Sequence, residues 1–405
     1  MAAPPCKAQQ TLCHRVCAIL PDEIMEEIFV RLPPKTVGRC RCLSRTWAAA
    51  LSHDAFVDRH RRLASGRGGL KLFFLHDAKA GNMEVRSWSL ADRSLAASPV
   101  AVFPDGMRTR CSSRCHGLVI MENTATGIHY VCNPSTGEMA ALPRVRPHNR
   151  KTDESLGIGY DARSKNHKVV RISYSNHRGF DGTDFRTLCE VYEINSRGAW
   201  RPPASSSALG MVKLDNMCVF AQGHLYWKWL GRQNPRITSF SLSDEAFKAL
   251  PPPPSCHGID QLYGLAELGG RLCLFGTATE PVQQHSIWLL RDHEAGVWDL
   301  HCRIDLNAAW PLEVTQFSIG RSSPSPLAFI DDDRRILFRV YCKLSKEERS
   351  KSAYKLYAYN PATGNAESLG FLPHRSTPPE LYEESVVSTG RPFEDIVSSS
   401  PSQEA

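Results

Sequence analysis

The sequence predicts an α+β protein in two parts, a small helical unit followed by a mostly-β, propeller-like domain of six to eight blades. Helical spacing of apolar residues is confined to the first 60 residues, whereas later apolar runs are short and bounded by Gly, Pro and Asn. In addition, an Asn-Pro-x-Thr-Gly turn begins at Asn133 and again at Asn360. This separation is close to five units of about 45 residues, the length of a four-stranded blade.

These patterns divide the chain into five segments. Residues 1–15 are polar and are expected to be disordered, and residues 16–60 form the helical unit. A Gly-rich stretch within 61–70 predicts a hinge. The β-domain then spans 71–384, and the Ser-rich, acidic residues 385–405 are predicted to be a flexible tail.

Composition limits the classes of partner. The chain has 405 residues, of which 42% are hydrophobic and 22% charged, which is typical of folded globular proteins. The net charge of +7 comes from interleaved Lys, Arg, Asp and Glu, so no basic stripe for nucleic acid is predicted. No run reaches the roughly 18 apolar residues of a membrane span, and the first ten residues lack the apolar core of a secretory signal. We therefore expect reduced cysteines and a cytoplasmic or nuclear location.

The β-domain is predicted from ten apolar runs, each four to eight residues long. These runs are 71–75, 117–121, 168–172, 217–221, 223–230, 237–242, 271–275, 286–290, 335–341 and 355–359. Both copies of the Asn-Pro-x-Thr-Gly turn follow a Tyr-containing strand, with Pro setting φ and Gly taking the left-handed position. Two matching turns do not prove a repeat, so a pair of β-sandwiches is the alternative architecture.

The first predicted helix begins at Leu20-Pro21. Pro suits a helix start, and the acidic residues that follow interact favourably with the positive end of the helix dipole. Ile24 and Ile28 form an i,i+4 pair, as do Met25 and Phe29, so apolar groups cover much of this helix.

A second helix is predicted after Leu32-Pro33. It carries Val37, Cys40 and Leu43 on one stripe, and the Ser-Arg-x-Trp sequence that ends at Trp47 follows. Arg39 and Arg41 are predicted to face solvent. A unit of this size rarely buries so many large apolar side chains without help, which favours a partner surface. The alternative is that the helices cap the β-domain.

The run from Leu20 to Trp47 resembles an F-box. LPDEI, RLP, RCRCLSR and the final Trp occur in family order and at family spacing, although Leu43 stands where Val is more common and Gly38 weakens the second helix. The resemblance implies a three-helix unit that binds a Skp-family adaptor, and through it a cullin and a RING subunit. Residues 70–370 resemble the F-box-associated region of plant, particularly grass, F-box proteins, on motifs such as CHGLV, CNPSTGE and GIGYD.

The resemblance also implies the adaptor-binding residues. Leu20, Pro21, Ile24 and Ile28 are expected to form one contact face. Six further residues are expected either to contact the adaptor or to pack behind it, and sequence does not separate these two roles. They are Leu32, Pro33, Val37, Cys40, Leu43 and Trp47.

No constellation of residues predicts catalysis or a cofactor. The sequence has no G-x-S-x-G elbow, no P-loop and no H-E-x-x-H. Cys111, Cys115 and His116 could supply three metal ligands, but no fourth is evident, and Cys13/Cys17 and Cys40/Cys42 lack a matching second pair, so no metal site is predicted. We expect a non-catalytic ligase receptor that recruits an unknown target. The alternatives are an F-box docking protein without a ligase role, and a propeller with its own small-molecule or carbohydrate site.

Overall fold

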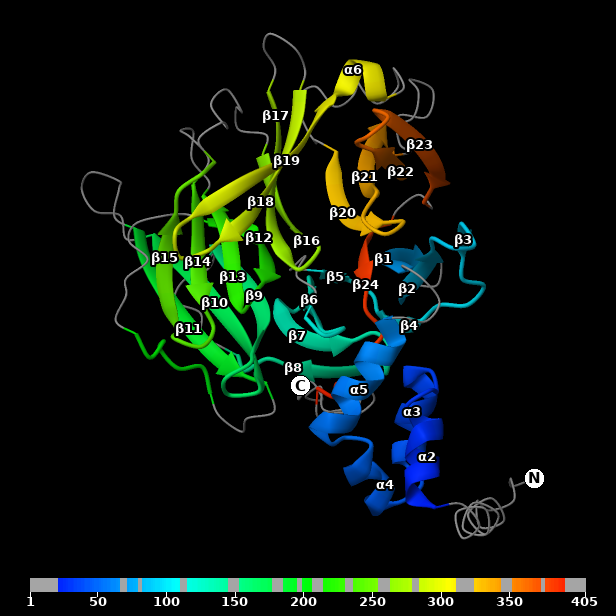
Figure 1. Ribbon diagram of the computed structural model, residues 1–405. Helices are drawn as coiled ribbons and strands as arrows, with labels where there is room; N and C mark the ends of the chain where they lie inside the picture. The colour runs from blue at the N-terminus through cyan, green and yellow to red at the C-terminus, as the bar shows by residue number, and fades with distance from the viewer. Residues whose placement is uncertain are drawn as a thin grey trace.

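The computed structural model shows a helical unit at one end of a ring of sheets (Figure 1). It describes residues 21–65, 71–78, 82–109, 115–144, 153–176, 185–194, 199–205, 214–229, 236–253, 263–278, 284–310, 324–343, 352–372 and 376–389. Segments 1–15 and 390–405, and the Gly-rich cluster at 66–70, therefore lie outside the described residues.

The helical unit contains four helices in its described part, where the resemblance implied three. They are α2 (Asp22–Phe29), α3 (Pro34–Arg41), α4 (Arg45–Ala50) and α5 (Asp54–Ser65). Pro34 occupies the first turn of α3, and the Ser44 hydroxyl caps α4 by accepting from the Trp47 N–H at 3.1 Å. The predicted hinge at 61–70 began too early, because residues 61–65 continue α5.

Six antiparallel sheets form the blades of the described propeller. Blade 1 contains β1 (Lys71–Ala78), β2 (Asn82–Ser89), β3 (Ser94–Leu95), β4 (Ala101–Pro104) and β24 (Glu380–Tyr382). Blade 2 contains β5 (Met107–Thr109), β6 (Val119–Asn123), β7 (Ile128–Asn133) and β8 (Glu138–Ala141), and blade 3 contains β9 (Asp153–Asp161), β10 (Asn166–Asn176) and β11 (Phe185–Glu193). Each of the ten predicted apolar runs overlaps a strand, and the β-sandwich alternative is wrong.

The remaining blades have four strands each. Blade 4 contains β12 (Leu214–Ala221), β13 (His224–Trp229), β14 (Ile237–Ser241) and β15 (Ala246–Leu250). Blade 5 contains β16 (Tyr263–Leu268), β17 (Arg271–Ala278), β18 (Gln284–Asp292) and β19 (Val297–Asp305), after which a short helix, α6 (Leu306–Ala309), follows. Blade 6 contains β20 (Ser325–Ile330), β21 (Arg335–Lys343), β22 (Ser352–Asn360) and β23 (Asn365–Phe371).

The ring is closed by the C-terminal strand. β24 pairs antiparallel with β1, so that Leu72 lies opposite Leu381. Both side chains are buried in one apolar cluster with residues of blade 6. The first and last parts of the β-domain thus share blade 1, which closes the ring.

The two copies of the repeated turn occupy equivalent positions, between the third and fourth strands of blades 2 and 6. In both, the Asn side chain accepts a backbone N–H two residues on at 2.9 Å, and Gly137 and Gly364 have φ of 79° and 73°. The copies are four blades apart, so the predicted spacing of five units was wrong. Long strands and connections make the blades longer than the assumed 45 residues.

A buried charged network joins blades 3 and 4. Lys168 Nζ lies 2.9 Å from Asp161 Oδ2 and 3.0 Å from Glu245 Oε1, and Arg201 contacts Glu245 at 2.6 Å. Burial by itself would raise the pKa of Glu245. Hydrogen bonds from Arg201, the Ala204 N–H and Lys168 outweigh this effect and lower that pKa to about 2.

We expect Lys168→Met to destabilise the propeller at pH 7 by roughly 3–5 kcal/mol, because it leaves two buried carboxylates without their shared cation. Since the folded-state pKa of Glu245 is depressed, the network stabilises the fold fully above the ordinary pKa of 4.5, and this contribution is lost as pH falls toward about 2. Urea unfolding at pH 7 and pH 3 measures the free energy of unfolding of the variant and the wild type. The difference between the two proteins should be smaller at pH 3 than at pH 7. Lys248→Met, which breaks an exposed pair with Glu294, is the control and should change little. A difference that does not depend on pH would contradict the assignment.

Candidate functional site

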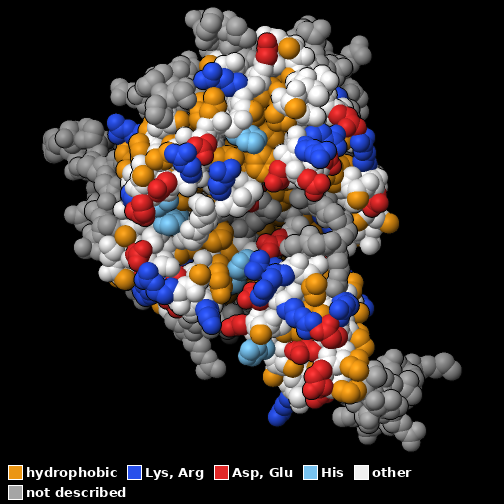
Figure 2. Space-filling model, viewed as in Figure 1, with side chains coloured by type: hydrophobic (Ala, Val, Ile, Leu, Met, Phe, Trp, Pro, Cys, Tyr) orange, Lys and Arg blue, Asp and Glu red, His pale blue; other side chains and the backbone are white. Residues whose placement is uncertain are grey.

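The exposed apolar residues of the helical unit include two on one side of α2. Met25 and Phe29 are buried, whereas Ile24 and Ile28 are 47% and 42% exposed. Leu43, which follows α3, is 48% exposed. These three are among seven large hydrophobic residues exposed in the described chain, although the unit is a small part of it. Hydrophobic side chains are visible among charged ones on this end of the molecule (Figure 2). Such exposure on a small unit is typical of a binding surface.

The structure shows which of the ten predicted residues are exposed and which are packed inside the helical unit. Pro21, Ile24, Ile28, Pro33 and Leu43 are exposed and are available for contact. Four others pack inward: Val37 is fully buried, and Leu32, Cys40 and Trp47 are half-buried against the core of the unit. Leu20 lies outside the described residues.

The core of the helical unit includes a residue from the far end of the chain. Phe29 and Trp47 meet edge to face with ring centroids 4.8 Å apart. Val386, 1% exposed, packs into the same cluster of buried residues as Phe29, Val37 and Leu51. We call residues 383–389 the C-terminal strap; Figure 1 shows the chain leaving β24 and running toward α5 and β8.

The strap is held on its other side by the turn between β7 and β8. Asn133 Nδ2 donates to the carbonyl oxygens of Ser385 at 3.1 Å and Val387 at 2.6 Å. The Ser385 N–H donates to Ser135 Oγ at 3.1 Å. The predicted flexible tail from residue 385 was therefore wrong for residues 385–389, because Val386 is buried, Val387 is half-buried, and several of the backbone groups are paired.

Arg41 links the helices to the strap. Its Nη2 donates to the carbonyl oxygens of Leu51 at 2.9 Å and Val386 at 2.6 Å, and its side chain is only 10% exposed. The prediction that Arg41 faces solvent was wrong, whereas Arg39 is exposed as predicted. The spacing of polar residues shows which side of a helix is polar. It does not show that a backbone carbonyl from a distant part of the chain will cover that side.

Comparison with known proteins identifies both parts of the chain. A family model described as the F-box associated beta propeller domain matches residues 68–319, more than half of the chain, and the F-box domain model matches residues 18–58. The chain belongs to the F-box-associated propeller family. Its four-helix unit is the F-box, and its six-bladed ring is the F-box-associated propeller.

Curated relatives are plant F-box proteins. The chain is 26% identical over 338 residues to the F-box/LRR-repeat protein At2g43260 of Arabidopsis thaliana, covering 80% of this chain and 76% of that protein. It is 27% identical over 356 residues to the putative F-box/kelch-repeat protein At1g12870 of the same species, covering 81% and 84%. Among solved structures, TolB from Acinetobacter baumannii aligns with a TM-score of 0.43 at 9% identity, covering 81% of this chain and 72% of that one.

A glycine of the propeller fits tightly against the strap. A Cβ added to Gly117 would lie 2.5 Å from Ser385 Cβ and 2.7 Å from the Glu383 carbonyl oxygen, and the φ of Gly117 is +77°. We expect Gly117→Ala to lower stability by at least about 2 kcal/mol, through the clash and the left-handed backbone. Thermal unfolding measures this. Gly127→Ala, also at positive φ but with nothing within 4 Å, is the control that isolates the clash. Equal losses in the two variants would contradict a tight strap.

A cavity of about 300 Å³ lies between blades 2 and 3, lined in part by Trp200, Arg144 and Leu156. The charge of Arg171, which also lines the cavity, is already paired. Arg171 contacts Glu154 at 2.7 Å and Glu190 at 3.0 Å. This cavity therefore does not favour the alternative of a small-molecule site in the F-box-associated propeller.

Among the described residues, one group could hold a metal ion, namely Cys115, His116 and His167. Burial lowers the pKa of His116 to about 4 and that of His167 to about 3, because a charged imidazole is poorly solvated there. The sequence pointed to Cys115 and His116 as possible ligands without predicting a site, and it missed His167, which is contributed by a different blade. Cys13, Cys17 and Cys111 lie outside the described part, and within that part no helix is long and apolar enough to cross a membrane.

Proposed function

We propose that this protein is the substrate-receptor subunit of an SCF-type ubiquitin ligase, acting in the cytoplasm or nucleus. Its F-box binds a Skp-family adaptor, through which it joins a cullin and a RING subunit, and its propeller recruits a target protein. The observation that carries the proposal is the exposed pair Ile24 and Ile28 on an F-box whose opposite side is packed against the strap.

The proposed role needs no chemistry from this chain. A receptor accelerates ubiquitin transfer by holding a target lysine near the charged conjugating enzyme, which raises its effective concentration. A receptor does this best when the distance between its two binding surfaces is constrained. Arg41 and Asn133, which hold the strap from opposite sides, provide such a constraint between the F-box and blade 2.

Proximity labelling in cells, with and without proteasome inhibition, tests the proposal. The wild-type chain is compared with an Ile24→Asp, Ile28→Asp variant. Substrates should be labelled by both chains, because the propeller is unchanged. Only the wild type should enrich the adaptor and cullin, and only with the wild type should labelled proteins accumulate when degradation is blocked. Adaptor and cullin binding without any accumulating protein would instead support an F-box docking protein that has no ligase role.

A further inference from the structure

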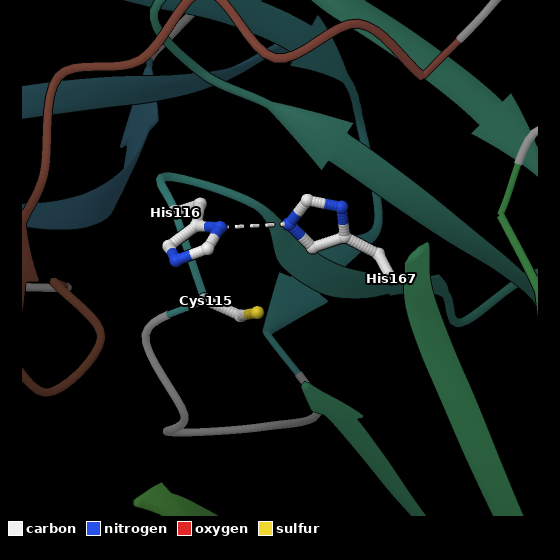
Figure 3. Close-up of side chains that lie close together, drawn as sticks. All are labelled: Cys115, His116 and His167. Atoms are coloured by element: carbon white, nitrogen blue, oxygen red, sulfur yellow. Dashed lines mark hydrogen bonds between the residues drawn. The ribbon is translucent and has the colours of Figure 1, made fainter. Parts of the chain in front are cut away.

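The group of Cys115, His116 and His167 lies where two blades meet. Cys115 and His116 precede β6 in blade 2, and His167 lies on β10 in blade 3. The Nδ1 atom of His116 is 3.1 Å from the Nε2 atom of His167, and the ligand atoms of all three residues lie within 4.8 Å of one another. Figure 3 shows a nitrogen of each imidazole pointing toward the other ring, with the Cys115 side chain lying beside the pair.

The backbone holds this group in place. The Leu118 N–H donates to the Cys115 carbonyl oxygen at 3.0 Å, which closes a tight turn around His116. His116 adopts a φ of 53°, a left-handed conformation that is uncommon for a residue other than Gly. Such a conformation persists only where the surrounding structure enforces it, and it is often found at functional sites.

We propose that Cys115, His116 and His167 form a binding site for a zinc-class divalent cation that joins blades 2 and 3. One thiolate and two imidazoles suit Zn²⁺ and disfavour Mg²⁺ and Ca²⁺, which prefer oxygen ligands. Three protein ligands leave a fourth tetrahedral position for water or an added ligand. This inference does not depend on the proposed ligase role.

Binding requires that the three ligand atoms, which lie within 4.8 Å of one another, close around the ion and that one proton is lost. Two nitrogens that each lie about 2.0–2.1 Å from a tetrahedral zinc ion are roughly 3.3 Å apart, close to the 3.1 Å in the structure. The proton that bridges the two imidazoles moves to the other nitrogen of its own ring, so that both facing nitrogens become ligands. Cys115 releases its thiol proton and binds as thiolate, so one proton leaves for each ion bound.

The competing explanation is that the two imidazoles bind no metal and only join blades 2 and 3 through a hydrogen bond. The Tyr160 ring packs against both imidazoles, with centroid distances of 4.7 Å to His116 and 5.0 Å to His167. Packing and a neutral hydrogen bond would account for these contacts without an ion. The experiment must therefore detect sulfur and nitrogen bound to the same metal.

Titration of the chelator-treated full-length protein with Co²⁺ makes that distinction. A tetrahedral site containing Cys should give a thiolate-to-cobalt charge-transfer band and intense visible bands at one equivalent, both displaced by Zn²⁺. Cys115→Ser should abolish the charge-transfer band, and His167→Gln should weaken binding at least 100-fold. The matched controls are Cys42→Ser, an exposed cysteine, and His293→Gln, from the stacked His224–His293 pair, and both should leave the bands unchanged.

X-ray absorption of the zinc-loaded wild-type protein provides a second measurement that does not depend on whether the variants fold. The expected shell contains one sulfur and two imidazole nitrogens. Three results would overturn the proposal and leave the hydrogen-bonded pair as the explanation. They are a coordination shell without sulfur, a charge-transfer band that persists in Cys115→Ser, and the absence of that band in the wild type.

Discussion

The Ile24→Asp, Ile28→Asp variant should lose binding to a Skp-family adaptor by at least about 100-fold while its fold remains intact. Both side chains are more than two-fifths exposed, so their replacement removes little packing from the chain itself. At an interface, each would bury a side chain worth about 1.5–3 kcal/mol, and a carboxylate in its place would be desolvated without a partner. A loss of about 3 kcal/mol already corresponds to more than 100-fold in the dissociation constant.

Calorimetric titration with purified adaptor measures this loss. The matched control is Val102→Asp, Leu188→Asp, because both residues are 46% exposed and lie outside the F-box, on propeller strands β4 and β11. The control should bind like the wild type. A Leu20→Ala, Pro21→Ala variant should also lose binding, with the β-domain still folded. If the Ile24 and Ile28 variant bound normally, the exposed side of α2 would not be the contact face.

The β-domain could be predicted well because its signal is local. Runs such as 168–172 and 271–275 are short, apolar and bounded by turn residues, and each needs only its own residues to identify it as a strand. The number of blades is a property of ring closure instead. It depends on connection lengths and on β24 pairing with β1 across the whole domain, and neither leaves a periodic pattern in the sequence.

The candidate site was predicted only in part, for a related reason. The resemblance identified the residues of α2, but exposure depends on which side of the helix the rest of the chain covers. Met25 and Phe29 are buried in a cluster that includes Val386, and Val386 lies in a Ser-rich segment whose composition suggests disorder. His167 was missed because a metal-ligand spacing is recognisable only within one segment, whereas this group is assembled from two blades.

Val386→Asp should detach the strap and destabilise the F-box by roughly 3–5 kcal/mol, while the propeller remains folded. The substitution removes a fully buried side chain from the core of the F-box and places a carboxylate there. A unit of some 45 residues has little core of its own, so it should depend on this added side chain. The closing strand β24 ends before the strap, so the ring should stay closed. Hydrogen exchange of α2–α5 compared with blades 4–6 measures the difference. Unchanged exchange in the helices would show that the F-box is stable without the strap.

The two copies of the repeated turn provide a built-in control for the same conclusion. Asn133 and Asn360 make the same hydrogen bond within their own turns, but Asn133 also donates to two carbonyl oxygens of the strap. Asn360→Ala should therefore lower the free energy of unfolding by about 1 kcal/mol, because only the hydrogen bond of the turn is lost. Asn133→Ala should lower it by about 1–3 kcal/mol more, because carbonyl oxygens of the strap also lose their donor. Hydrogen exchange should become faster in the F-box helices only for Asn133→Ala, because only Asn133 holds the strap. The difference between the two variants therefore separates the effect of the strap from that of the turn. Equal effects would mean that the strap is held by Val386 and Arg41 without help from the turn.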